Sequence, residues 1–112
     1  MKIVICDDDK FIRDIFKEIF EQEKIDYYAV QSGEEVLEVL NNDKAVSKIF
    51  LDYSLDKMNG IETAQKIKKI DKNVEIYLLS GWNQTKFSKD EMALFTKFLK
   101  KPFDLDEIVE LF

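Results

Sequence analysis

Ile3-Val4-Ile5-Cys6-Asp7-Asp8 is a short apolar run, rich in β-branched residues, that ends in two carboxylates. Runs of this kind are typical of the buried strands of a parallel sheet. Open α/β sheets bind their ligands outside the carboxyl ends of their strands, so polar residues at several strand ends should converge at one edge. Three later apolar runs also end at polar residues: Ile49-Phe50-Leu51 before Asp52, Ile76-Tyr77-Leu78-Leu79 before Ser80, and Phe98-Leu99 before Lys100-Lys101-Pro102.

The converging side chains would comprise three carboxylates, a hydroxyl and an ammonium: Asp7, Asp8, Asp52, Ser80 and Lys101. Mg²⁺ prefers a few carboxylates together with water and phosphate oxygens, so this set suits a divalent cation and a phosphoryl group. Asp52 is the candidate nucleophile, because a carboxylate can attack phosphorus and form an acyl phosphate. The other two carboxylates would repel an incoming phosphoryl group, which is a further reason to expect a cation.

Segments with a helical spacing of apolar residues alternate with these strands, and a second strand is expected at about Tyr27 to Val30. The expected helices carry the apolar sets Phe11–Phe20, Val36–Leu40, Ile61–Ile70, Met92–Phe95 and Ile108–Phe112. Their expected starts are Asp8 or Asp9, the capping-box patterns at Ser32 and Ser88, Gly60, and Asp104 with Glu107. A loop is expected from Gly81 to about Phe87.

This alternation predicts an α/β fold, a (βα)5 doubly wound five-stranded parallel sheet with right-handed crossovers and helices on both faces. We expect one domain over residues 1–112, because the chain has no linker, repeat or low-complexity segment.

The composition excludes several classes of protein. The net charge is -6, with no block of five like charges, so direct nucleic-acid binding is not expected. No apolar run approaches the ~20 residues that span a membrane, and no signal peptide is visible before the first strand. A lone Cys6, expected to fill the core, fits the cytoplasm. The chain has no histidine, so any phosphohistidine must come from a partner.

Four motifs in this order resemble the receiver domain of bacterial response regulators over essentially the whole chain. They are Ile5-Cys6-Asp7-Asp8-Asp9, Leu51-Asp52 with Met58-Asn59-Gly60, Leu79-Ser80-Gly81, and Lys100-Lys101-Pro102-Phe103. The resemblance implies a flavodoxin-like topology with strand order 2-1-3-4-5. It also implies Mg²⁺-dependent phosphoryl transfer to Asp52 from the phosphohistidine of a histidine kinase or histidine phosphotransfer protein. Such a domain catalyses its own phosphorylation and dephosphorylation but is mainly a signalling switch.

The resemblance also implies a role for each site residue. Asp8 and Asp52 would ligate the metal directly, Asp7 would act through metal-bound water, and Ser54 would contribute its backbone carbonyl. Lys101 would balance charge on the phosphoryl oxygens, from a peptide bond to Pro102 that is cis in the family. The Ser80 hydroxyl and the Gly81 N–H would donate hydrogen bonds to the same oxygens.

The resemblance implies a switch as well. On phosphorylation Ser80 would move toward the phosphoryl group and Phe98 would follow it inward. The surface of the fourth helix, fifth strand and fifth helix would then bind a target protein. Trp82 stands where the family modulates access of the hydrolytic water, and its bulk predicts slow self-dephosphorylation.

Three residues or pairs depart from the family pattern. Asp56 replaces the usual proline and adds a negative charge near the rim, Leu94-Phe95 replaces a small pair, and Phe98 replaces the frequent tyrosine. Three alternatives remain in view: a pseudo-receiver that binds partners without phosphorylation, an aspartate-based phosphatase using Asp52 and Ser54, and a flavodoxin-like cofactor binder. Ser54 cannot serve as the phosphatase acid, and no Gly/Ser/Thr-rich phosphate loop follows the first strand.

Overall fold

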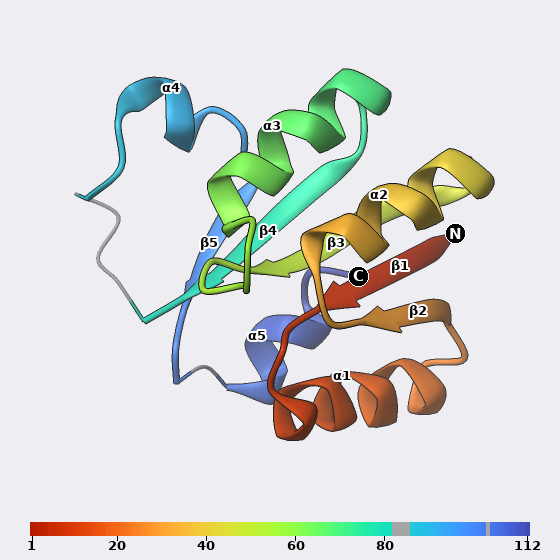
Figure 1. Cartoon of the computed structure of the whole chain (residues 1–112). Helices are drawn as coiled ribbons and strands as arrows, with labels where there is room; N and C mark the ends of the chain where they lie inside the picture. The colour runs from red at the N-terminus through yellow and green to blue at the C-terminus, as the bar shows by residue number, and fades with distance from the viewer. Residues whose placement is uncertain (82–85, 103) are drawn as a thin grey trace.

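Strands and helices alternate along the chain in the computed structural model, which describes residues 1–81, 86–102 and 104–112 (Figure 1). The elements are β1 (Lys2–Cys6), α1 (Lys10–Gln22), β2 (Asp26–Val30), α2 (Gly33–Asn42), β3 (Val46–Asp52), α3 (Gly60–Ile70), β4 (Glu75–Ser80), α4 (Lys89–Met92), β5 (Lys97–Lys100) and α5 (Leu105–Val109). The strands form one parallel sheet in the order β2-β1-β3-β4-β5. This confirms the predicted fold class and strand order.

Helices cover both faces of the sheet, with α1 and α5 on one side and α2, α3 and α4 on the other (Figure 1). Successive residues of a strand point to opposite faces. On β1, Ile3 and Ile5 therefore pack toward α1 and α5, whereas Val4 and Cys6 pack toward α2 and α3. All four are fully buried, which accounts for the uninterrupted apolar run in the sequence.

Aromatic rings fill much of the core between the sheet and α1. Phe50 of β3 stacks on Tyr77 of β4 with 4.9 Å between ring centroids, and Phe16 of α1 lies 5.1 Å from Phe50. Phe20 and Phe112 continue the cluster, 5.4 Å from each other. Rings at these spacings add stabilisation beyond the area they bury, so these contacts contribute to holding α1 against the sheet.

The predicted helix starts are confirmed where a side chain caps the helix. Asp9 accepts a hydrogen bond from the N–H of Phe11 at the start of α1, and Ser32 accepts one from the N–H of Glu35 at the start of α2. Ser88 forms the predicted capping box with Glu91.

The helix predicted to carry Met92 to Phe95 is shorter than expected and ends at Met92. Its last turn tightens, because the N–H groups of Leu94 and Phe95 bond to carbonyls three residues back. Phe95 is then buried and packs edge-on against Phe98 of β5 at 5.3 Å. The chain therefore turns into β5 at the place where the sequence pattern alone would extend the helix.

No helix within the described ranges is both long enough and apolar enough to cross a bilayer.

Gly60 permits a close approach that fixes the loop after β3. A Cβ at this position would lie 2.8 Å from the Tyr53 Cα and 2.9 Å from the Asp52 carbonyl oxygen, and the Gly60 N–H donates to the Tyr53 carbonyl at 2.8 Å. Both neighbours are backbone, so neither can rotate away.

We therefore expect Gly60→Ala to lower the free energy of unfolding by about 1–3 kcal/mol in urea titrations, as overpacking does. Gly81→Ala is the matched control, since a Cβ there meets nothing within 4 Å, and we expect a change of at most about 0.5 kcal/mol. Equal stability of the two variants would contradict this account of the loop.

Candidate functional site

Three carboxylates meet at the carboxyl edge of the sheet, and we call Asp7, Asp8 and Asp52 the acidic cluster. One carboxylate oxygen from each lies within 4.8 Å of the other two. Asp7 directly follows β1 and is fully buried, Asp8 is exposed, and Asp52 ends β3 and is buried. Neighbouring parallel strands thus bring together residues that are 45 positions apart in the sequence.

Lys101 binds two members of the acidic cluster at once. Its Nζ lies 3.1 Å from Asp7 Oδ2 and 3.1 Å from Asp52 Oδ1. Its backbone N–H donates to the carbonyl of Ser80 at 2.9 Å, which ties the chain after β5 to the end of β4. The Lys101-Pro102 peptide bond is cis, as the family resemblance implied.

Burial and charge shift the acidity of the site. Burial, reinforced by the nearby Asp7 carboxylate, raises the pKa of Asp52 to about 6, although Lys101 and the Ser54 N–H both act to lower it. For Lys101, burial acts to lower the pKa, but Asp52 and Asp7 outweigh it and the pKa is raised. Lys101 therefore stays charged at neutral pH, and Asp52 is mostly ionised there.

The acidic cluster opens to solvent through a shallow depression lined by Asp7, Asp8, Asp9, Asp52, Ser54, Gly81 and Lys101. Ser54 and Gly81 are both exposed at its rim. Ser80 is buried at the end of β4. The structure thus brings together the predicted carboxylates, the lysine, and the predicted Ser54 and Gly81 backbone groups.

Phe98 and Asp56 lie outside this depression. Phe98 is half-buried on the α2–α4 side of the sheet, where its ring stacks on Phe87 at 5.8 Å. Phe87 in turn contacts Tyr53, the residue after Asp52, at 5.5 Å. Asp56 is exposed and is not among the residues that line the depression, and the charge it was expected to add near the rim stays a prediction. Trp82 falls outside the described residues.

Two contacts at the site were not predicted from the sequence. Asp9 lines the depression although its side chain caps α1, and Arg13 of α1 reaches back to donate from Nη1 to the Asp7 carbonyl at 2.8 Å. Arg13 lies four residues after the helix cap, one turn along α1. That spacing was the only sequence signal that it would face the strand end.

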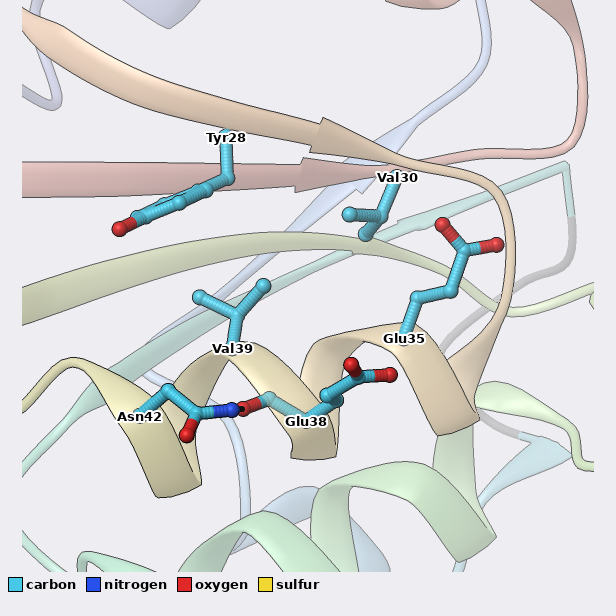
Figure 2. Close-up of a pocket in the computed structure, with 6 residues that line it drawn as sticks. All are labelled: Tyr28, Val30, Glu35, Glu38, Val39 and Asn42. Atoms are coloured by element: carbon cyan, nitrogen blue, oxygen red, sulfur yellow. Dashed lines mark hydrogen bonds between the residues drawn. The ribbon is translucent and has the colours of Figure 1, made fainter.

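A second groove runs between the edge strand β2 and α2 (Figure 2). Figure 2 shows Glu35 and Glu38 on α2 and Tyr28 on β2 among its lining residues. The Asn42 side chain donates to the Glu38 carbonyl at 2.8 Å, which is a contact within the helix. This groove shares no lining residue with the depression over the acidic cluster.

Comparisons with known proteins agree with this geometry. The profile of the family described as response regulator receiver domain matches residues 3–112. Sporulation initiation phosphotransferase F of Bacillus subtilis is 29% identical over 109 residues, which cover 96% of this chain and 86% of that protein.

A second relative is longer than this chain. Transcriptional regulatory protein CpxR of Escherichia coli is 27% identical over 108 residues, and the match covers 96% of this chain but only 46% of CpxR. The structure of response regulator TrrA from Thermotoga maritima, in complex with Mg²⁺ and BeF, is 26% identical with a TM-score of 0.85. That match covers 98% of this chain and 94% of TrrA.

The raised pKa of Asp52 predicts a pH-dependent penalty in the metal-free protein. The pKa of the Asp52 carboxyl is 3.8 in the unfolded chain and about 6 in the folded protein. Between these values the native state holds a proton that the unfolded state has lost, so stability falls as pH rises through this window. At pH 7.5 the ionised Asp52 carboxylate should lower the free energy of unfolding by on the order of 3 kcal/mol if the folded structure does not rearrange around it.

Asp52→Asn cannot titrate, so we expect it to be more stable than wild type at pH 7.5 and to lose this advantage near pH 4. Urea unfolding in EDTA at four pH values measures the difference in free energy of unfolding between the variant and wild type. Asp56→Asn, which removes an exposed carboxylate, is the control. If the stability difference between Asp52→Asn and wild type did not change with pH, the Asp52 charge would not be buried as assigned.

Proposed function

The chain belongs to the response regulator receiver domain family of two-component systems, and we propose that it accepts a phosphoryl group on Asp52 in a Mg²⁺-dependent reaction. The observation that carries the proposal is Lys101, whose ammonium bridges the Asp7 and Asp52 carboxylates beside a third carboxylate. The donor would be a phosphohistidine, and because the chain lacks histidine, that phosphohistidine would belong to a partner, a histidine kinase or a histidine phosphotransfer protein.

The charge balance of the site fits a divalent cation. Three carboxylates and one ammonium leave two net negative charges, which Mg²⁺ would neutralise. The ligands would be Asp8, Asp52 and the Ser54 carbonyl. Both oxygens of Asp7 already accept hydrogen bonds, from the Asp9 N–H and from Lys101, which supports a role for Asp7 through metal-bound water. The structure of TrrA, which is a complex with Mg²⁺ and BeF, supports Mg²⁺ as the metal.

Bound Mg²⁺ would supply charge stabilisation for the phosphoryl oxygens. The chain's own residues perform the transfer. A carboxylate oxygen of Asp52 attacks phosphorus as the phosphorus–nitrogen bond to the donor imidazole breaks, and the imidazole nitrogen keeps the electron pair. Lys101, the Ser80 hydroxyl and the Gly81 N–H lie at the carboxyl ends of β5 and β4, where they would stabilise the transferred oxygens.

Phosphorylation would bias a two-state equilibrium of Ser80 and Phe98, and the α4-β5-α5 surface would then bind a target protein. The partial burial of Phe98 against Phe87 leaves the ring at the margin of the core, which is compatible with such movement. With a net charge of -6, we propose a protein target rather than direct contact with nucleic acid. The buried free thiol of Cys6 fits our proposal of a cytoplasmic location.

We expect incubation with Mg²⁺ and acetyl phosphate to add one phosphoryl group, detected by intact-mass analysis. Asp52→Asn should abolish this addition because the amide has nearly the same shape but is a poor nucleophile. Asp56→Asn, which changes a nearby exposed carboxylate in the same way, should be phosphorylated like wild type. An Asp52→Asn protein modified at the wild-type rate would show that the acceptor lies elsewhere. No modification of wild type under any donor would instead favour a pseudo-receiver.

Mg²⁺ should raise the melting temperature of wild type, because it binds the folded state and offsets repulsion in the acidic cluster. By mass action, a concentration 100 times the Kd adds about 2.7 kcal/mol of stability. In Asp8→Asn the shift should shrink, since one ligand charge is lost. Differential scanning fluorimetry at low salt measures both shifts. A melting curve of wild type that ignores millimolar Mg²⁺ would count against a preformed metal site.

A further inference from the structure

Arg13 is the only arginine of the chain, and it contacts the backbone of the acidic cluster. From α1 its Nη1 donates a hydrogen bond to the carbonyl oxygen of Asp7 at 2.8 Å, and the side chain is half-buried. A guanidinium is always charged and carries five donors in a planar fork, so it is well suited to hold a carbonyl at a fixed place. The hydrogen bond spans six residues.

The Asp7 backbone needs this partner because Asp7 lies just beyond the last residue of β1. Its N–H still reaches β2 and donates to the Val30 carbonyl at 3.2 Å. Its own carbonyl accepts from Arg13. Asp7 is fully buried, so water has poor access to replace a lost donor. Arg13 therefore completes the hydrogen bonding of the backbone at the residue where strand gives way to turn.

Further hydrogen bonds fix the rest of the turn. The Asp9 N–H donates to Asp7 Oδ1 at 2.9 Å, and the Arg13 N–H donates to the Asp9 carbonyl at 3.1 Å. The Arg13 side chain thus holds the carbonyl of Asp7, and the Arg13 backbone N–H holds the carbonyl of Asp9. Asp8 is the single residue between them, and its carboxylate is exposed on the depression. The position of Asp8 follows from how firmly its two neighbours are held.

We propose that Arg13 is a positioning residue that preorganises Asp7 and Asp8 for a divalent cation. The inference rests on the proposed function of the acidic cluster. Lys101 performs the charge balancing by contacting two carboxylates, whereas Arg13 contacts a carbonyl and orients the carboxylates through the backbone. Groups that orient the ligands of a metal typically change its affinity about 10–100-fold when they are removed.

The test is the Kd of Mg²⁺ measured by isothermal titration calorimetry on the full chain, without a phosphodonor. Arg13→Met keeps the apolar stem but removes the donor, and we expect its Kd to rise about 10-fold. Lys17→Met is the matched control, because Lys17 is a half-buried cation one turn farther along α1, and its Kd should stay within about 2-fold of wild type. Arg13→Lys keeps the charge with a single donor group and should give an intermediate Kd.

The phosphorylation rate gives a second readout that a purely structural role would not move. In Arg13→Met the rate should be lowered at subsaturating Mg²⁺ and should recover when Mg²⁺ is raised to saturation. If every folded Arg13 variant bound Mg²⁺ with the wild-type Kd, even a variant with a lower melting temperature, the positioning role of Arg13 would be wrong. The proposed metal site would be unaffected by this result. Absence of Mg²⁺ binding by wild type would instead overturn the proposed metal site and this inference with it.

Discussion

Repulsion among three carboxylates at one edge of the sheet is the constraint on which the rest of this structure depends. Lys101 offsets part of it by contacting Asp7 and Asp52, which precede it by 94 and 49 residues. A single ammonium therefore joins the ends of β1, β3 and β5. Two net negative charges remain beside Asp52, the proposed nucleophile, and a bound cation would neutralise them.

The centre of the sheet that imposes this constraint was predictable from sequence, because β1, β4 and the second half of β3 are buried and read as apolar runs. Strand ends, and hence the meeting of Asp7, Asp8 and Asp52, follow directly from those runs. The extent of α4 was not predictable in the same way. Met92 to Phe95 fit a helix locally, but the burial of Phe95 against Phe98 is a contact with β5 that overrides the local pattern.

Arg13 shows a second limit of sequence reasoning. Its bond is to a main-chain carbonyl, and every residue has one, so no side-chain pairing in the sequence marks it. Asp56 is exposed and is not among the residues that line the depression, and its effect on the site stays a prediction.

The two faces of the sheet differ in how tightly they hold their aromatic rings. Phe16, Phe20 and Phe50 are fully buried beneath α1, where any ring movement would open a cavity. On the opposite face Phe98 is only half-buried, between Phe87 and Phe95. Within the part of the chain that the structure describes, the rings that contact Phe98 are apolar and would offer no hydrogen-bond partner to a hydroxyl placed between them. The proposed movement of Phe98 would therefore depend on how its ring packs against these neighbours and not on a new hydrogen bond.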